Sequence, residues 1–263
     1  MNAQRIMELS RAGAPGLVKV EIVAETGSTN ADLLARAPTL EGPVLLAAEH
    51  QTAGRGRAGR SWLSAPGHSL TFSLAWKFDG GLHKLTGLPL AVGTALAETL
   101  GRLGQPVQLK WPNDLLKDGD KLAGILVETA RADTPAASDG AVWTIIGIGL
   151  NLAMPDDLEQ QIGRPVAAVP WLARMDRDAL LAALLDGLFD ALVQFEQSGF
   201  AAFTARWNLL HGWQGQLVTI LDRGEVLHEG LAAGVDDAGR LLLDTESGRV
   251  AIVAGDVSLR MKA

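Results

Sequence analysis

The chain of 263 residues is 48% hydrophobic with a formal net charge of -7, so it can bury a large core, and we expect one main domain and a small one. This acidic balance argues against a general nucleic-acid binder, and because no apolar run reaches membrane-spanning length and no signal peptide is evident, we expect a compact cytoplasmic protein. The absence of cysteine excludes disulfides, thiolate metal sites and cysteine nucleophiles.

Short apolar runs and helix-capping residues predict the elements of the first part of the chain. Ser, Thr and Asn at positions 28–30 favour a helix start, because their side chains accept hydrogen bonds from the first backbone N–H groups. Apolar residues with a 3.6-residue period predict a helix over 88–103 that covers one face of a sheet. We expect residues 1–18 to contribute little to the core. Strands are predicted at 19–23, at 44–48 and, with one buried face, at 69–76.

The second part of the chain is predicted to add a hairpin, a helix and a small β-domain. Apolar runs at 124–128 and 142–148 predict a hairpin whose tip, 129–141, is mobile. The apolar period over 179–195 predicts a packing helix. Four short apolar runs, closely spaced along the chain, predict a small SH3-like barrel. They lie at 217–220, 226–230, 240–243 and 250–253.

The fold class that these elements predict is α+β. We expect a mixed β-sheet with helices packed on it over residues 1–211, followed by the C-terminal SH3-like barrel over residues 212–263. The domain boundary is placed near the His-Gly pair at 211–212.

Residues 54–60, with the sequence Gly-Arg-Gly-Arg-Ala-Gly-Arg, bring three arginines and three glycines together in an acidic protein. We call this segment the Gly-Arg loop. Glycine lets backbone N–H groups approach a ligand closely, and arginine presents a planar fork that matches phosphate or carboxylate oxygens. A solvated basic loop or a nucleic-acid patch is the alternative interpretation. Because predicted strands lie on both sides, we favour an anion-binding loop of a folded sheet.

Two further motifs carry charged and amide side chains. In Lys-Trp-Pro-Asn-Asp at 110–114, the proline restricts its own φ and disfavours helical geometry for the tryptophan, so we expect Asn113 and Asp114 in a rigid turn after a strand. Lys121 opens the apolar segment 121–128, where an ammonium is partly desolvated beside a reacting anion. For Lys121 alone, a solvated strand-end lysine would be the better interpretation. Its combination with the other motifs favours a functional role.

Five motifs in this order resemble the biotin protein ligases, also called biotin–[acetyl-CoA-carboxylase] ligases. The resemblance covers residues 20–260, including the predicted barrel, and it implies the fold that these ligases share with class II aminoacyl-tRNA synthetases. The motifs are Ser28-Thr29-Asn30, the segment 51–62 around the Gly-Arg loop, and the segments 110–114, 121–128 and 147–151.

The resemblance implies a reaction in two steps. Biotin and Mg-ATP give biotinyl-5′-adenylate and pyrophosphate. The ε-amine of a lysine on a biotin carboxyl carrier domain, from acetyl-CoA carboxylase or a related carboxylase, then displaces AMP. Such chemistry depends on positioning and charge neutralisation more than on a nucleophilic side chain, so the lack of cysteine is no obstacle.

The resemblance also implies roles for individual residues. Lys121 and Arg57 are expected to be catalytic, with Lys121 between the biotin carboxylate and the α-phosphate. Asp114 is expected to hold Mg²⁺. Contacts with biotin are expected from Ser28, Thr29, Asn30, Gln51, Gly54, Arg55, Arg57, Lys121, Gly124 and Gly147. Contacts with ATP and the adenylate are expected from Arg57, Arg60, Trp62, Lys110, Asn113, Lys121, Gly149 and Asn151.

Two other functions fit parts of this pattern. A lipoate ligase or an octanoyl transferase shares the fold, although the transferase type works through a cysteine that this chain lacks. A biotin or adenylate sensor without catalysis is the second alternative, and the retention of Lys121, Arg57 and Asp114 argues against it. Many bacterial relatives begin with a DNA-binding domain; fewer than twenty residues precede the first predicted strand, so we expect no DNA partner. Both monomers and homodimers are compatible with the family, and we expect the Gly-Arg loop to be disordered without ligand.

Overall fold

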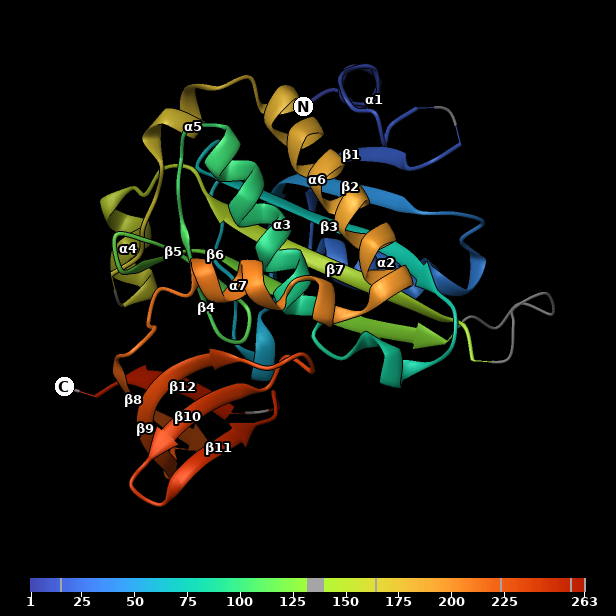
Figure 1. Cartoon of the computed structure of the whole chain (residues 1–263). Coiled ribbons are helices and arrows are strands. Elements are labelled where there is room, and N and C mark those ends of the chain that lie inside the picture. The colour runs from blue at the N-terminus through green and yellow to red at the C-terminus, as the bar shows by residue number, and fades with distance from the viewer. Residues whose placement is uncertain (15, 132–139, 164, 223, 256, 263) are drawn as a thin grey trace.

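The computed structural model describes residues 1–14, 16–131, 140–163, 165–222, 224–255 and 257–262. Its main layer is a seven-stranded mixed sheet with the order β1-β2-β3-β7-β6-β5-β4 (Figure 1). β1 and β2 are parallel, and the other neighbours in the sheet are antiparallel. The strands are β1 (Lys19–Thr26), β2 (Val44–Gln51), β3 (Ser69–Phe78), β4 (Gln108–Lys110), β5 (Asp114–Lys117), β6 (Asp120–Arg131) and β7 (Val142–Asn151).

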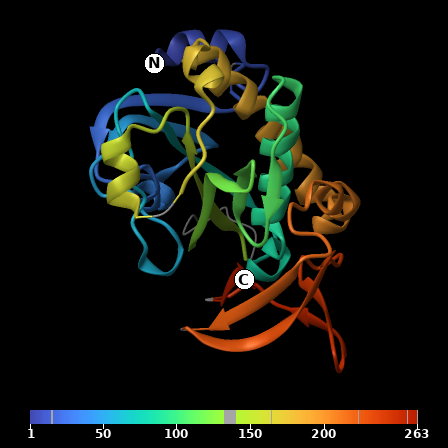
Figure 2. The same cartoon turned by 90° about the vertical axis from the view of Figure 1, so that its left-hand side faces the viewer.

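Helices cover both faces of this sheet. α3 (Leu88–Arg102) and α6 (Arg177–Ser198) pack together on one face, as Figures 1 and 2 show, and α2 (Thr29–Arg36) packs on the other. Successive side chains of β2 point to opposite faces of the sheet. Leu45 therefore belongs to the core under α3 and α6, whereas Leu46 packs with Leu33 of α2. Helices α3 and α6 confirm the two helices predicted from the apolar period.

Strand β3 is buried on both faces, although its alternation predicts only one buried face. The face that would be solvated carries Ser69, Thr71 and Ser73, and each of these side chains is buried. The prediction was wrong because small hydroxyl residues do not require solvent when α2 and a polar cavity lie over them. Strands β6 and β7 form the predicted hairpin, and residues 132–139 of its tip lie outside the described residues.

The first residues also depart from expectation. α1 (Ala3–Leu9) packs on α6, and Ile6 is fully buried in the main core. Ser10 Oγ donates to Asp186 Oδ1 at 2.6 Å. Residues 1–18 therefore do contribute to the core. A helix of seven residues with one buried apolar side chain is too short to produce a recognisable period.

The remaining helical segments connect these layers. They are α4 (Asp156–Ile162), α5 (Pro170–Arg174), α7 (Thr204–Leu210) and the 3-10 turns η1 (Ala37–Thr39), η2 (Arg57–Gly59), η3 (Leu82–Leu85) and η4 (Phe200–Ala202). Within the described residues, we find no helix with the length and apolar character that crossing a bilayer requires.

The C-terminal part is a second, antiparallel sheet with the order β11-β10-β9-β8-β12 (Figure 1). It confirms a separate small β-unit but corrects the predicted barrel, because the described residues show no pairing between the edge strands β11 and β12 that would close the sheet. The fifth strand, β12, was not predicted and pairs with β8. The strands are β8 (Leu217–Asp222), β9 (Glu225–Val235), β10 (Leu241–Thr245), β11 (Gly248–Ile252) and β12 (Val257–Met261).

Specific contacts join the two sheets. Trp111 Nε1 donates to the carbonyl of Gly239 at 3.1 Å, and the backbone N–H of Gly212 donates to the carbonyl of Leu109 at 2.9 Å. His211 is buried at this junction, and burial lowers its pKa. The C-terminal sheet is thereby held beside the turn at 111–113. The domain boundary at 211–212 stays a prediction.

Candidate active site

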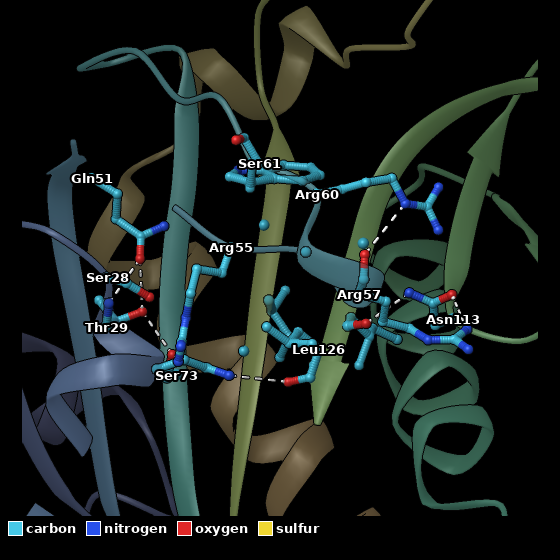
Figure 3. A pocket seen from close by; sticks show the side chains of 18 of the residues that line it. Ser28, Thr29, Gln51, Arg55, Arg57, Arg60, Ser61, Ser73, Asn113 and Leu126 are labelled. Atoms are coloured by element: carbon cyan, nitrogen blue, oxygen red, sulfur yellow. Dashed lines mark hydrogen bonds between the residues drawn. The ribbon is translucent and has the colours of Figure 1, made fainter. Parts of the chain in front are cut away.

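A cavity lies between the N-terminus of α2, strands β3, β6 and β7, and the Gly-Arg loop (Figure 3). We call it the main cavity. The structure brings most of the predicted site residues to its walls, namely Ser28, Thr29, Asn30, Gln51, Arg55, Arg57, Arg60, Trp62, Asn113, Asp114, Lys121, Gly124, Gly147 and Gly149. Residues from all five motifs, which are distant in sequence, therefore meet at one place.

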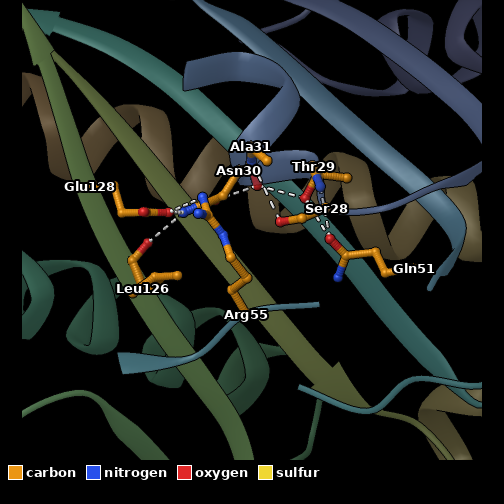
Figure 4. Close-up of polar contacts among 9 residues, drawn as sticks. Ser28, Thr29, Asn30, Ala31, Gln51, Arg55, Leu126 and Glu128 are labelled. Atoms are coloured by element: carbon orange, nitrogen blue, oxygen red, sulfur yellow. Dashed lines mark hydrogen bonds and ion pairs between the residues drawn. The ribbon is translucent and has the colours of Figure 1, made fainter. Parts of the chain in front are cut away.

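One end of the main cavity is lined by uncharged polar side chains. Ser28 is the N-cap of α2, so the helix start holds the next two residues against the sheet. Thr29 donates from its backbone N–H and its Oγ1 to Gln51 Oε1, at 2.8 and 3.2 Å, and its Oγ1 lies 2.6 Å from Ser73 Oγ (Figure 4). Thr29, Gln51 and Ser73 are buried. These donors and acceptors form a rigid, polar wall.

Asn30 links this wall to the Gly-Arg loop. Its Oδ1 accepts from Ser73 Oγ at 2.6 Å, and its Nδ2 donates to Glu128 Oε2 at 2.8 Å. Arg55 Nη2 donates to the same carboxylate oxygen at 2.9 Å (Figure 4). Sequence reasoning assigned no role to Ser73 or Glu128. The Ser-Thr-Ser pattern on one face of β3 was the signal for Ser73, since hydroxyl side chains inside an apolar strand need polar partners.

Glycines on β7 and β6 leave room for side chains to enter the cavity. A Cβ at Gly147 would lie 2.3 Å from Asn30 Oδ1, and one at Gly149 would lie 2.2 Å from the ring of Trp62. At Gly124 a Cβ would meet Lys121 Nζ at 3.1 Å. No larger residue fits at 147 or 149 without moving Asn30 or Trp62.

The Gly-Arg loop folds into a narrow hairpin-like turn. Trp62 N donates to the Gly54 carbonyl at 2.9 Å, and Gly56 N donates to the Arg60 carbonyl at 2.6 Å. The loop reverses at Ala58 and Gly59, which have φ angles of 53° and 69°. Gly54 lies at the base of this turn and not on the wall of the main cavity, and a Cβ there would lie 2.5 Å from the Trp62 carbonyl. Gly54 thus allows the two arms of the loop to lie close to each other.

Arg57 extends from the loop across the mouth of the cavity. Its Nη1 donates to Asn113 Oδ1 at 3.0 Å (Figure 3), and its Nη2 donates to the carbonyl of Gly255 in the C-terminal sheet unit. Asn113 is itself fixed, because its Nδ2 donates to the Ile125 carbonyl at 2.8 Å. The guanidinium therefore bridges the turn after β4 and the loop before β12.

Lys121 and Asp114 form an ion pair on the adjacent strands β5 and β6. Lys121 Nζ lies 2.5 Å from Asp114 Oδ1, and the two side chains are 19% and 16% exposed. Lys121 Nζ also lies 5.8 Å from the centroid of the Trp62 ring. Partial burial strengthens its interaction with an incoming anion. With Arg57 and Arg60 also on the wall, this end of the cavity suits phosphate or carboxylate groups.

A second cavity, of about 540 Å³, adjoins the main cavity. The two share Arg60, Ser61, Trp62 and Lys121, and the second also includes Asn151. Asn151 is buried, and its Nδ2 donates to the carbonyls of Ala167 and Lys121 at 3.0 and 3.4 Å. We call this second cavity the Trp62 cavity. Lys121 thus lies where the polar cavity meets a larger space walled by an indole ring.

Lys110, like Gly54, is a predicted site residue that does not lie on the wall of the main cavity. It does not line any of the cavities described for the main sheet, and its Nζ lies 4.4 Å from the centroid of the Trp213 ring. Its side chain therefore contacts the segment that leads into the C-terminal sheet. The turn that follows Lys110 redirects the chain so that Asn113 and Asp114, but not Lys110, reach the cavity.

The sequence matches known families and proteins over most of its length. The model of the biotin/lipoate A/B protein ligase family matches residues 22–151, and the model of the biotin protein ligase C-terminal domain matches residues 215–260. The bifunctional ligase/repressor BirA of Escherichia coli is 34% identical over 267 residues, covering 99% of this chain and 78% of that protein. The biotin--[acetyl-CoA-carboxylase] ligase of Mycobacterium tuberculosis is 34% identical, covering 95% of this chain and 92% of that protein.

A solved structure has a similar fold. The biotin protein ligase from Aquifex aeolicus in complex with biotin and ATP superposes with a TM-score of 0.75 and 28% sequence identity, covering 92% of this chain and 99% of that one. The fold and the cavity thus define a member of the biotin and lipoate protein ligases. Within this class, the chain belongs to the biotin protein ligase family.

The glycine at 149 offers a test of the cavity geometry. In Gly149→Ala the new methyl group meets the Trp62 ring, so we expect the KM for ATP to rise about tenfold, with a loss of stability of about 1–3 kcal/mol. Gly101→Ala is the matched control, since a Cβ there meets nothing within 4 Å. Thermal unfolding and steady-state kinetics would measure both effects. An unchanged KM in Gly149→Ala would contradict the position of Trp62 described above.

Proposed function

We infer that the protein is an ATP-dependent biotin ligase, which activates biotin as biotinyl-5′-AMP and transfers it to a lysine of a biotin carboxyl carrier domain. The observation that carries this inference is the position of Lys121, at the junction of a polar cavity and the Trp62 cavity. The structural relatives include complexes with biotin and ATP and with biotinylated ATP. Acetyl-CoA carboxylase or a related carboxylase is the proposed source of the carrier domain, following the name of the relatives.

The polar end of the main cavity is proposed to hold the biotin head. A ureido group has one carbonyl acceptor and two N–H donors, so it needs both kinds of partner from the protein. Ser28, Thr29 and Gln51 supply hydroxyl and amide groups, and Asn30 completes this wall. Gly124 and Gly147 line the same cavity and are proposed to border the biotin, and their lack of side chains leaves the room that Lys121 and Asn30 occupy.

The charged end is proposed to carry out activation. A biotin carboxylate oxygen bonds to the α-phosphorus of ATP, and the bond to the leaving pyrophosphate breaks. Both reactants are anions, so Lys121 between the carboxylate and the α-phosphate lowers their repulsion, and Arg57 neutralises charge on the phosphate. Lys121 would then exchange part of its interaction with Asp114 for the substrate oxygens.

The Trp62 cavity is proposed to hold the adenosine. The indole of Trp62 offers a flat surface for the adenine, and Arg60 lies beside it. Gly149 admits the Trp62 ring, and Asn151 fixes the strand end that lines this cavity. Lys110, whose Nζ lies over the Trp213 ring, is left out of this proposed site.

We propose Mg²⁺ with ATP, and the donor set fits a substrate-bound ion. Mg²⁺ is usually held by one or two carboxylates together with phosphate oxygens and water. Among the described residues there is no cluster of three or more His, Cys, Asp or Glu side chains that would hold an ion without substrate. Asp114 offers one carboxylate beside Lys121. Asp114 would hold the ion, which would offset phosphate charge.

The two other parts of the proposal concern location and assembly. We propose action in the cytoplasm, because the chain lacks cysteine and its proposed substrates include ATP. The proposed site is built from the residues of one chain, so both a monomer and a homodimer would contain it.

ATP–pyrophosphate exchange tests which carboxylic acid the protein activates. Biotin should support the exchange, whereas lipoate and octanoate should not, because the polar wall of Thr29, Gln51 and Asn30 matches a ureido group and not a dithiolane ring or an alkyl chain. Exchange with lipoate alone would instead favour the lipoate ligase. Binding of biotin without exchange would favour a sensor.

The Gly-Arg loop is expected to become protected on ligand binding. Arg55, Arg57 and Arg60 are trypsin sites, and the loop is held by few backbone hydrogen bonds. Biotin with ATP should slow cleavage within residues 54–60 by about tenfold or more, since substrate anions order the arginines. Mass spectrometry of tryptic fragments would measure this, with cleavage after Arg249 as the internal control. Equal cleavage of the loop with and without ligands would contradict ordering.

A further inference from the structure

A third cavity, of about 400 Å³, lies between the main sheet and the C-terminal sheet. We call it the intersheet cavity. Its walls are mostly apolar and come from the start of α3, the turn before β5, strand β6 and the loops after β9 and β11, with Pro89, Leu90, Pro112, Val127 and Val253 among them. Val253 is 68% exposed, so the cavity opens to the surface at that side.

The intersheet cavity meets the main cavity at its charged end. The two share Arg57, Asn113 and Ile125. Arg57 donates to Asn113 Oδ1 and to the Gly255 carbonyl, so its guanidinium lies across the junction. A side chain that enters the intersheet cavity would therefore approach the acyl carbon of the adenylate. The position of that carbon follows from the proposed function.

The geometry of acyl transfer requires such an approach. When the amine attacks, the acyl carbon still carries both the biotin chain and the AMP group. The main cavity is then filled by biotin and the Trp62 cavity by adenosine, so the acceptor needs another opening. A further cavity, lined by residues 50–54 and 61–64, adjoins the main cavity at Gln51, Ser61 and Trp62, and its walls include none of the charged residues Arg57, Arg60 and Lys121. Of these neighbours, the intersheet cavity is the one that reaches the charged end.

The chemistry of this cavity also suits a lysine side chain. Its apolar walls accommodate the tetramethylene stem, as they do for other amphipathic side chains. Desolvation and the positive charge of Arg57 both disfavour an ammonium, so they lower the pKa of an incoming lysine and favour the neutral amine. The amine nitrogen then bonds to the acyl carbon, the bond to the phosphate oxygen breaks with its electron pair on AMP, and the amine proton passes to solvent.

We propose that the intersheet cavity receives the acceptor lysine of the carrier domain, together with apolar side chains that flank this lysine. This proposal rests on the proposed function and deepens it, because it separates the residues that recognise the protein acceptor from those that activate biotin. Val253 and Ala254 belong to the recognition surface and lie outside the main cavity and the Trp62 cavity.

Two substitutions at the rim test this separation. Val253→Asp adds a charge, and Ala254→Trp adds volume; both residues are exposed, so folding should be retained. Leu209→Asp is the control, since Leu209 is 87% exposed and does not line the described cavities. Three rates are measured for each protein: biotin-dependent ATP–pyrophosphate exchange, transfer of biotin to hydroxylamine, and transfer to a carrier domain at varied concentration.

The expected result is a selective loss. In both rim variants kcat/KM for the carrier domain should fall about tenfold or more, while exchange and transfer to hydroxylamine stay within about twofold of the wild type. A carrier kcat/KM unchanged in both rim variants, or a loss shared equally with hydroxylamine, would overturn the proposal while leaving biotin activation intact. If the wild-type protein shows no biotin-dependent exchange, the proposed function fails and this inference fails with it.

Discussion

Lys121→Ala is expected to reduce kcat/KM for biotin-dependent ATP–pyrophosphate exchange by about 10²–10³-fold. Lys121 Nζ lies at the junction of the main and Trp62 cavities, 2.5 Å from Asp114 Oδ1. Without the ammonium, the carboxylate of biotin and the α-phosphate repel each other, and the charge of Asp114 adds to that repulsion. Exchange kinetics with varied biotin and ATP measure the loss.

A matched substitution separates this effect from a general loss of charge. Lys117 lies on the neighbouring strand β5, and its Nζ donates to the Pro106 carbonyl at 3.2 Å, away from the cavities. The Lys117→Ala variant should therefore catalyse ATP–pyrophosphate exchange at a rate within about twofold of that of the wild type, as expected for a surface substitution. If Lys121→Ala retained wild-type exchange while remaining folded, the proposed activation site would be wrong.

Arg57→Gly is expected to release the adenylate early. The guanidinium would contact the phosphate of biotinyl-5′-AMP, and losing charge-assisted hydrogen bonds to a buried phosphate should speed dissociation by about 10–100-fold. Released adenylate reacts with any exposed amine, so a bystander protein mixed with the variant should acquire biotin on several lysines. Rapid filtration measures the release, and mass spectrometry measures the bystander labelling.

The control for this prediction is a surface arginine. Arg249 pairs with Asp244 on the C-terminal sheet and does not line any of the described cavities. Arg249→Gly should hold the adenylate as the wild type does. Retention of the adenylate by Arg57→Gly as tight as that of the wild type would count against Arg57 as a phosphate clamp, and would direct attention to Arg55 and Arg60 of the same loop.

The residues predicted for the site converge in the structure, whereas parts of the surrounding fold differ from the prediction. The Gly-Arg loop, the turn with Asn113 and Asp114, and the strand that begins near Lys121 carry residue types with strong chemical preferences, and they converge as expected on one cavity. Each motif is short and local, so its geometry follows from glycine, proline and strand ends. Their convergence depends on the sheet order, which no local motif shows.

Other features depend on long-range packing that no local pattern shows. The buried hydroxyl of Ser73 looks like a solvent-facing residue until α2 covers that face of β3. Glu128 becomes a link between Asn30 and Arg55 only because β6 lies beside α2 and the Gly-Arg loop. The open C-terminal sheet is a further example, since closing a sheet depends on strand tilt and register, which the spacing of strands in the sequence does not show.

The most direct test of the account is the mass of a carrier domain incubated with the protein, biotin and Mg-ATP. We expect one added biotin on one lysine, no addition with lipoate, and almost none with Lys121→Ala. Addition of lipoate in place of biotin, or equal modification by Lys121→Ala and the wild type, would contradict the assignment of the substrate or of the residue at its centre.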